Sequence, residues 1–493
     1  MERSNDPDSS MHRANETVTP RTARRWLALV FIATGQCLIA IDVTVVTVAL
    51  PSVDASLSMA QGSGQWVIAA YSLAFGALLL PGGRLADMFG HRRVLIFGMV
   101  SFCLASLLAG LAWSGPVILA ARAWQGVSGA LISPSALAMV SSTFTDERER
   151  RKAFGIYSAV ASGGLALGFI VGGVVTQYLG WRWAFLLNVV PGVIATTGIG
   201  LTLPKRAGAP DARLDVRGST LAVGCVCLLV IGVSRLGVPG GGGGSVMLLA
   251  GALVLVLILS RVERSARFPL LPPRVIANRI RVGVNGVMLF AIGGLFGLFM
   301  LSTYYFQTVR QFSPVESGLG FLPLVIALAA GSTVVVSRLA WLPPRIVIVI
   351  GFGLTVIATL MLTGLTERSS YVTLVLPVQV LLGIGLGLVT VLATEFATTG
   401  LDAEDSGIAS AVFVTVQQVG AAVGTVLSSV TSKHGVAEYT AAHPHVRADS
   451  PEAVMAGFSS SLTWTGVVLV VGAVIAYVLV TPERRVSVGP STA

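Results

Sequence analysis

An acidic residue lies inside the first long apolar run of the chain. The run extends from Trp26 to Leu50, and Asp42 lies in its second half. A helix that rises about 1.5 Å per residue would carry this run across a hydrocarbon core about 30 Å thick. A carboxylate at that depth costs about 2.5–3.5 kcal/mol on insertion scales, so it must face a bundle interior or a watery cavity. Asp42 is therefore either a proton or cation site, or a buried acid that only hydrogen-bonds a neighbouring helix.

A basic residue and an amide occur together in a later apolar run. Arg122 lies within residues 116–140, Gln125 follows three positions later and Gly126 four positions later. Residues with this spacing share one face of a helix. Arg122 could extend its side chain to the outer interface, but the neighbouring amide favours a polar cavity.

A second acid, Glu395, lies at the inner end of the run 371–394. It is either a solvated carboxylate at the rim or a second acid on a transport path, since helix ends that face a cavity are also wet.

Catalytic and metal-binding patterns are missing from the apolar runs. They contain no histidine, no paired carboxylates and no set of cysteine and histidine at helical spacing, which argues against an enzyme. Three histidines fall in a polar outer segment that offers no evident fourth metal ligand: His434, His443 and His445. We therefore expect no metal site and no bound cofactor.

The composition predicts an all-α polytopic membrane protein. Of 493 residues, 54% are hydrophobic and only 11% are charged, whereas charged residues make up about 25% of soluble domains. The mean hydropathy is +0.81. The net charge of +10 does not indicate nucleic-acid binding, because the basic residues lie between the apolar runs and not on one soluble face.

Fourteen spans are expected in a 6+2+6 arrangement. We divide the chain into a cytoplasmic tail (1–25), a six-helix bundle (26–205), two extra helices with a Gly-rich outer loop (206–267), a second six-helix bundle (268–485) and a tail (486–493). The expected spans are 26–50, 64–86, 94–113, 116–140, 153–176, 183–203, 216–236, 245–261, 282–309, 317–340, 345–365, 371–394, 406–431 and 461–481.

The distribution of basic residues predicts the orientation. Most of the 33 Lys and Arg residues fall in the segments that are inside if the N-terminus is cytoplasmic, and short basic loops stay in the cytoplasm. Both termini are therefore expected inside, and the segment Ser432 to Phe458 outside. One inner loop, Thr399 to Ser406, is acidic and departs from this trend.

The loop after the second span carries a specific motif. Gly83 to Arg93 reads GRLADMFGHRR, in which Gly83 and Gly90 permit a tight turn, Asp87 is placed to cap or pair with a neighbouring helix end, and Arg92 and Arg93 hold the inner leaflet. The spacing G-x-L-A-D-x-x-G-x-R-R resembles the loop 2–3 signature of the major facilitator superfamily, where this loop acts as a cytoplasmic latch between conformations.

Other stretches extend the resemblance over most of the chain. Leu119 to Pro134 is similar to the fourth-helix pattern of the superfamily. Ile41 to Pro51, which reads IDVTVVTVALP and includes Thr44, resembles the first-helix signature of fourteen-span drug:H⁺ antiporters, with Thr47 in place of the usual Asn. Trp181 to Val189, which contains Asn188, resembles the entry to helix six of the same family.

Glycines in the fifth span resemble the antiporter motif of the superfamily. Gly164, Gly168 and Gly172 recur every four residues and Gly173 follows, which permits close packing of helix backbones. The motif usually contains a proline, and Phe169 stands at its position. This departure weakens the inference of antiport.

The resemblance implies a major facilitator fold and proton-coupled export of small hydrophobic or amphipathic compounds, such as antibiotics or cationic drugs. Asp42, Arg122 and Glu395 would then serve proton or cation coupling, and Gln125 and Thr44 would line the transport path. The expected partners are a small-molecule substrate, protons and the lipid bilayer of a bacterial inner membrane, with the protein a monomer. Uptake by symport or exchange is the alternative, and a membrane-embedded receptor or enzyme is a more distant one.

Overall fold

The computed structural model describes residues 20–480 except 60–63, 205–214, 237–240, 266–274, 276, 367–368, 402 and 449. Within these residues the secondary structure is entirely helical. The first half of the chain contains α1 (Pro20–Ser56), α2 (Gln65–Phe89), α3 (His91–Gly110), α4 (Gly115–Thr143), α5 (Glu147–Tyr178), α6 (Trp183–Leu186) and α7 (Val189–Thr202).

Two helices follow this first bundle: α8 (Val216–Arg235) and α9 (Gly242–Ser265). The remaining elements are α11 (Arg279–Tyr304), η2 (Tyr305–Val309), α12 (Pro314–Gly320), α13 (Leu322–Ala330), η3 (Gly331–Val335), α14 (Val336–Arg338), α15 (Pro344–Thr363), η4 (Tyr371–Val375), α16 (Leu376–Thr398), α17 (Ala403–Ala442) and α18 (Pro451–Leu479).

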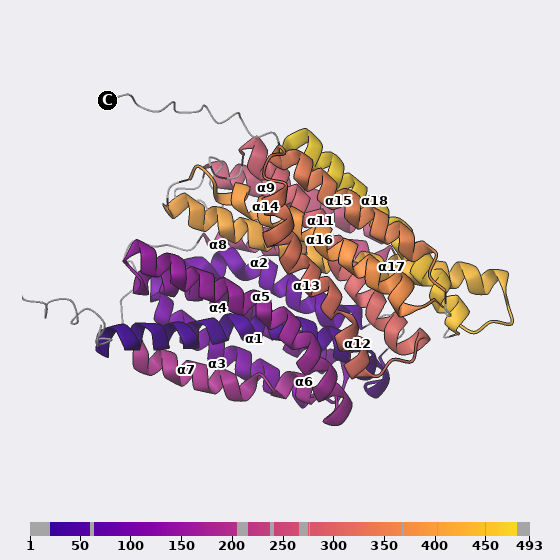
Figure 1. Ribbon diagram of the computed structural model, residues 1–493, viewed down its shortest axis with the longest axis horizontal. Helices are drawn as coiled ribbons and strands as arrows, with labels where there is room; N and C mark the ends of the chain where they lie inside the picture. Colours follow the sequence, from indigo (N-terminus) through magenta and orange to yellow (C-terminus); the bar gives the residue numbers. More distant parts are fainter. Residues whose placement is uncertain are drawn as a thin grey trace, which may run out of the picture.

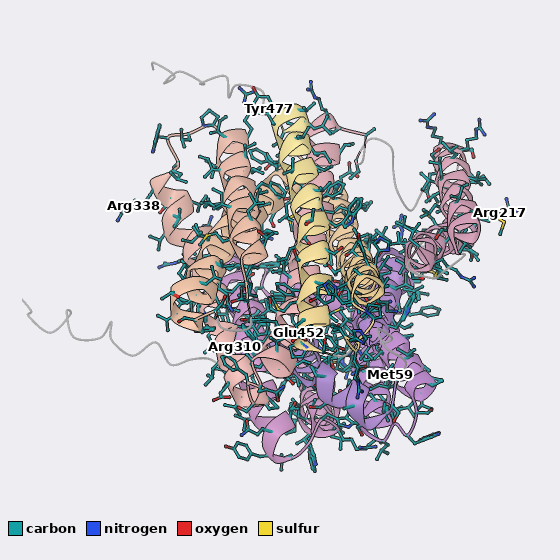
Figure 2. The ribbon with its side chains drawn as sticks, turned by 90° about the vertical axis from the view of Figure 1, so that its right-hand side faces the viewer. Met59, Arg217, Arg310, Arg338, Glu452 and Tyr477 are labelled. Carbon is teal, nitrogen blue, oxygen red and sulfur yellow. The ribbon has the colours of Figure 1, made fainter. Side chains whose placement is uncertain are left out.

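The helices form two bundles that lie side by side. Helices α1–α7 make one half and α11–α18 the other (Figure 1). The α8–α9 hairpin, near Arg217, stands at the edge of the molecule, and α18 runs between Glu452 and Tyr477 (Figure 2). Helix α8 packs on both α2 and α17, so the extra pair covers the seam between the bundles.

The predicted spans coincide with helices throughout. Among the described residues, thirteen helical segments are long and apolar enough to cross a membrane. The remaining predicted span is α4, a helix of 29 residues that contains Arg122 and Gln125 and packs against α2 and α3. Its polar residues are shielded by its neighbours, so it needs less apolar surface than a helix that faces lipid.

Two boundaries were predicted wrongly. The segment Ser432 to Phe458 is largely helical, because α17 continues to Ala442 and α18 begins at Pro451. The glycines Gly242 to Gly244, predicted as loop, form the first turn of α9. In both cases hydropathy marks only the lipid-facing part of a helix, whereas the backbone hydrogen bonds continue into the water. The tails 1–19 and 486–493 and the prolines at 269, 272 and 273 lie outside the described residues.

The bundles are joined at the end that is predicted to lie outside the cell, hereafter the outer end. Gln307 of η2 donates to the carbonyl of Val48 on α1 at 2.8 Å, and the Tyr304 hydroxyl donates to the Asp54 carboxylate. These two contacts close the outer end. The bundles also pack on each other through α2 and α17, where a Cβ on Gly76 would lie 2.9 Å from the Gln418 Cβ.

Candidate functional site

The side chain of Asp42 is buried at the centre of a hydrogen-bonded cluster in the first bundle. Its Oδ2 accepts from Arg122 Nη1 at 2.5 Å, and its Oδ1 accepts from Gln125 Nε2 at 3.0 Å and from Asn188 Nδ2 at 2.9 Å. Asp42 is 0% exposed and Arg122 is 1% exposed. A buried charge is stable only when it is paired and hydrogen-bonded, and this carboxylate meets both conditions.

Arg122 is held from several sides. Its Nε donates to the carbonyl of Val67 at 2.8 Å, and Nη1 also donates to Gln125 Oε1 at 2.8 Å. Its guanidinium carbon lies 4.5 Å from the centre of the Tyr71 ring, within the range of a cation–π contact. The guanidinium therefore faces the bundle interior and does not extend to the outer interface.

Close helix packing brings these groups together. A Cβ on Gly126 of α4 would lie 2.3 Å from the carbonyl oxygen of Tyr71 on α2, so only glycine permits this approach. On α4, Arg122 lies one turn before Gly126, and Gln125 directly precedes it. Asp42 comes from another helix, α1. The contact between α2 and α4 thus fixes the donors around the acid.

The cluster contains residues that sequence reasoning did not assign to the site. Asn188 lies at the start of α7 and its amide contacts Asp42, whereas the sequence placed it only in a family motif. Ser106 of α3 accepts from Gln125 at 2.8 Å. A polar residue within an apolar run was the available signal for both, but serine is too common in membrane helices for that signal to be specific.

Thr44 is not part of the cluster around Asp42, and its side chain faces Gly168 of α5. Its hydroxyl donates to the backbone of its own helix, at Ile41, at 3.1 Å, and its side chain is buried under α5. Two residues along a helix correspond to about 200°, so Thr44 points away from the side of α1 that carries Asp42. Gln125 is also fully buried, but it belongs to the cluster.

Glu395 is not part of the cluster. It lies near the end of α16 in the second bundle, and its side chain is exposed. The structure therefore agrees with a solvated carboxylate at the rim.

The loop between α2 and α3 forms a tight turn. Gly90 has φ of +91°, a conformation that favours glycine, and it separates the two helices. Asp87 lies 3.8 Å from Arg84 of its own helix and 3.5 Å from His91, the first residue of α3, so one of its two partners is at the neighbouring helix end. Arg92 does reach another helix, since it donates to the carbonyl of Gly200 on α7 at 2.5 Å, whereas Arg93 is exposed.

The glycine repeat of α5 packs directly on α1. A Cβ on Gly164 would lie 3.0 Å from Ala40, one on Gly168 2.9 Å from the Ile41 carbonyl, and one on Gly172 2.8 Å from the Val45 Cα. Gly173 faces the other bundle, because its Cβ would lie 2.6 Å from the Pro314 carbonyl. Helix α5 is thus clamped between α1 and α12.

The family of the chain follows from its sequence as well as its architecture. A family model described as Major Facilitator Superfamily matches residues 32–425. The chain belongs to the major facilitator superfamily. Members of this superfamily are transporters, and the chain is a multi-pass membrane protein.

Named relatives cover most of the chain. The puromycin resistance protein pur8 of Streptomyces alboniger is 40% identical over 462 residues, which are 93% of this chain and 92% of the relative. The cephamycin export protein CmcT of Amycolatopsis lactamdurans is 38% identical and covers 84% of this chain and 86% of its own length. The tetracenomycin C resistance and export protein of Streptomyces glaucescens is 33% identical over 415 residues, which are 83% of this chain and 75% of the relative.

A solved structure shares the fold. A bacterial homologue of the human lysosomal transporter Spinster, solved in an inward-facing and occupied conformation, aligns with a TM-score of 0.68 over 92% of this chain and 96% of its own. The sequence identity is 16%, so this likeness bears on the fold alone.

Proposed function

We propose that this chain is a proton-coupled exporter of small hydrophobic or amphipathic compounds, including antibiotics. Three of its relatives are named for resistance to or export of antibiotics: puromycin, cephamycin and tetracenomycin C. The observation that carries the proposal is the buried Asp42–Arg122 pair, which is bonded further by Gln125 and Asn188.

The cluster suits coupling because its stability depends on the charge of one carboxylate. A proton on Asp42 removes the ion pair with Arg122 and turns one acceptor oxygen into a donor. The hydrogen bonds from α4 and α7 must then rearrange, which links protonation to the packing of three helices. Proton uptake from outside and release inside would drive cargo outward, provided that the two binding events are linked.

The chain is proposed to lie in a bacterial cytoplasmic membrane with both termini inside, as the charge distribution predicts. Uptake by symport is less well supported than export. The missing proline of the antiporter motif is the argument for symport, whereas three relatives are named for resistance or export.

A drug-susceptibility panel tests the exporter directly. An efflux-deficient bacterium would express the wild type, the Asp42→Asn variant or an empty vector, with protein abundance in the membrane measured for each. The wild type should raise the inhibitory concentration of at least one hydrophobic or amphipathic antibiotic, and Asp42→Asn should not. Unchanged susceptibility to the whole panel, despite correctly inserted wild-type protein, would contradict export of such compounds.

A further inference from the structure

An aromatic residue of the first bundle is inserted into the core of the second. Phe169 belongs to α5, yet its side chain is 0% exposed and is part of the core cluster of the second bundle, with Phe299 of α11 and Phe321, which lies between α12 and α13, as its ring partners. Its ring is stacked on Phe321, with centroids 4.7 Å apart and planes inclined by 22°. It meets Phe299 edge-on at 5.5 Å and 73°. These are the favoured geometries of aromatic pairs.

The position of Phe169 on α5 determines when its ring can leave. Gly168 and Gly172 fix one side of α5 against α1, whereas a Cβ on Gly318 of α12 would lie 2.2 Å from the Phe169 carbonyl oxygen. Helix α5 packs more extensively on α1 than on α12, so it belongs to the first bundle, whereas Phe299 and Phe321 belong to the second. A separation of the bundles at the outer end would therefore withdraw the ring and open a slot between Phe299 and Phe321.

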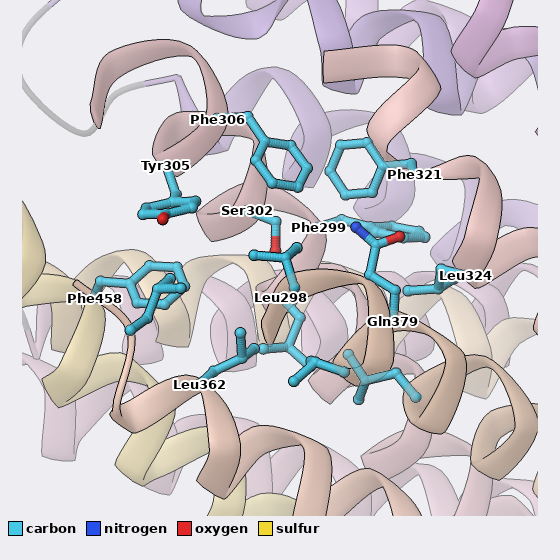
Figure 3. Close-up of a pocket in the computed structure, with 14 residues that line it drawn as sticks. Leu298, Phe299, Ser302, Tyr305, Phe306, Phe321, Leu324, Leu362, Gln379 and Phe458 are labelled. Atoms are coloured by element: carbon cyan, nitrogen blue, oxygen red, sulfur yellow. The ribbon is translucent and has the colours of Figure 1, made fainter. Parts of the chain in front are cut away.

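A small cavity adjoins this slot. Its volume of about 20 Å³ has room for about one water molecule. Figure 3 shows the amide of Gln379 near the rings of Phe299 and Phe321, with Ser302 on the same cavity. Gln379 is only 4% exposed, and its Oε1 has no hydrogen-bond partner among the described residues. A buried acceptor without a partner costs about 1–3 kcal/mol, so a ligand that donates to it would gain from the contact.

We propose that the slot between Phe299 and Phe321 binds an aromatic ring of the cargo that carries a hydrogen-bond donor, and that Phe169 fills this slot when the outer end is closed. The proposal rests on the exporter function above and assigns one subsite within it. The Phe169 ring itself shows that the slot accepts an aromatic ring, and Gln379 Oε1 supplies the acceptor.

Competition for one slot gives Phe169 a role in transport. Cargo in the slot opposes closure of the outer end, and the returning ring of Phe169 expels the cargo to the outside. The residue that replaces the usual proline would thus make cargo re-entry from outside unfavourable.

The closure of the outer end by the Phe169 ring, hereafter the plug, is tested by cysteine accessibility. The four native cysteines are replaced and Val48, which is 0% exposed at the outer end, is changed to cysteine as a reporter. An impermeant thiol reagent is then applied to whole cells. Phe169→Ala should increase labelling several-fold.

Phe352→Ala is the matched control, because it removes a fully buried phenylalanine elsewhere in the second bundle and should leave labelling unchanged. If Phe169→Ala does not fold, Phe169→Leu keeps most of the apolar volume and should give an intermediate increase. Unchanged labelling in a folded Phe169 variant would overturn the plug.

The ring subsite is tested by binding to purified Phe169→Ala protein, with thermal stabilisation as the measure. Toluene should bind roughly 2- to 10-fold more tightly than methylcyclohexane, as expected for an aromatic pair. Adding Gln379→Leu should lower the ratio of phenol to toluene affinity by roughly 2- to 10-fold, the effect of one hydrogen bond.

Equal binding of toluene and methylcyclohexane, or a phenol-to-toluene ratio that ignores Gln379, would overturn the subsite. These measurements require no transport. Aromatic binding with no export would leave the slot intact and refute the exporter, and export without aromatic binding would refute the slot alone.

Discussion

The guanidinium of Arg122 on α4 and the carboxylate of Asp42 on α1 form an ion pair in which Nη1 and Oδ2 lie 2.5 Å apart. Both side chains are completely buried. Removal of one partner from a buried pair leaves an uncompensated charge, whereas removal of both leaves only the neutral polar side chains of Gln125, Asn188 and Ser106. The pair therefore predicts a strong and unequal response to single and double substitutions.

Arg122→Leu should destabilise the purified protein by about 3–5 kcal/mol, because Asp42 would remain buried without its cation. The double variant Arg122→Leu, Asp42→Leu should recover a large part of that loss. The measurement is the unfolding midpoint in detergent for the four members of the cycle. A double variant less stable than Arg122→Leu would show that the two residues do not act as a pair.

Gly168→Ala should destabilise the protein by about 1–3 kcal/mol, as expected for overpacking. The added Cβ would lie 2.9 Å from the Ile41 carbonyl oxygen and would clash with the Thr44 hydroxyl. Gly163→Ala on the same helix is the matched control, since nothing lies within 4 Å of its Cβ, and it should stabilise the protein by about 0.4–1 kcal/mol. The thermal unfolding midpoints should change in opposite directions, and equal effects would argue against tight packing of α5 on α1.

Asp87→Asn should leave the fold intact. Its carboxylate is about two-fifths exposed and its partners lie at 3.5 and 3.8 Å, so the pairs contribute about 0–1 kcal/mol here. If Asp87 makes a stronger contact only in the outward-open state, the variant should shift the ratio of inner to outer cysteine accessibility roughly tenfold or more. An unchanged ratio in a well-expressed variant would limit Asp87 to a topological role.

The orientation predicts which sites an external reagent can reach. In a protein without native cysteines, Ala441→Cys at the end of α17 should react with an impermeant thiol reagent in whole cells, and Ser9→Cys should not. Labelling of Ser9→Cys, or protection of Ala441→Cys in folded protein, would contradict the fourteen-span orientation.

The sequence predicts the fold well because a bilayer imposes a simple rule. Each backbone polar group must be satisfied within the segment, so a long apolar run must be a helix. The same rule fails at helix ends in water, which is why the extension of α17 to Ala442 was missed. Hydropathy predicts the length of α4 but not the contacts of Arg122, because the partners of Arg122 include residues of other helices.

The site was only partly predictable. The depth of Asp42 and the spacing of Arg122 and Gln125 mark them as unusual from sequence alone. Asn188 lies 146 positions from Asp42 and joins it only through the packing of α7 on α1. Thr44 is in the same sequence motif as Asp42 but lies apart from the cluster, because residues two apart on a helix face nearly opposite directions. Phe169 could be seen as a departure from a motif, but its partner rings belong to the other bundle.

The energy available from proton coupling sets the scale for the central claim. Each inward proton contributes about 2.3 kcal/mol per 100 mV of membrane potential, and a tenfold proton gradient adds about 1.4 kcal/mol. Together they could sustain a cargo gradient of several hundredfold per proton, provided that Asp42 is the group that takes up and releases the proton.

The most direct measurement of this claim is cargo-induced loss of a preformed pH gradient in inside-out vesicles. The cargo is an antibiotic to which the wild type confers resistance, and the vesicles contain equal amounts of wild type, Asp42→Asn or Glu395→Gln. Cargo should release protons through the wild type and through Glu395→Gln, whose carboxylate is exposed and remote from the cluster, but not through Asp42→Asn. Equal proton release by the wild type and Asp42→Asn would contradict the account, because it would make Asp42 a structural acid and place the coupling elsewhere.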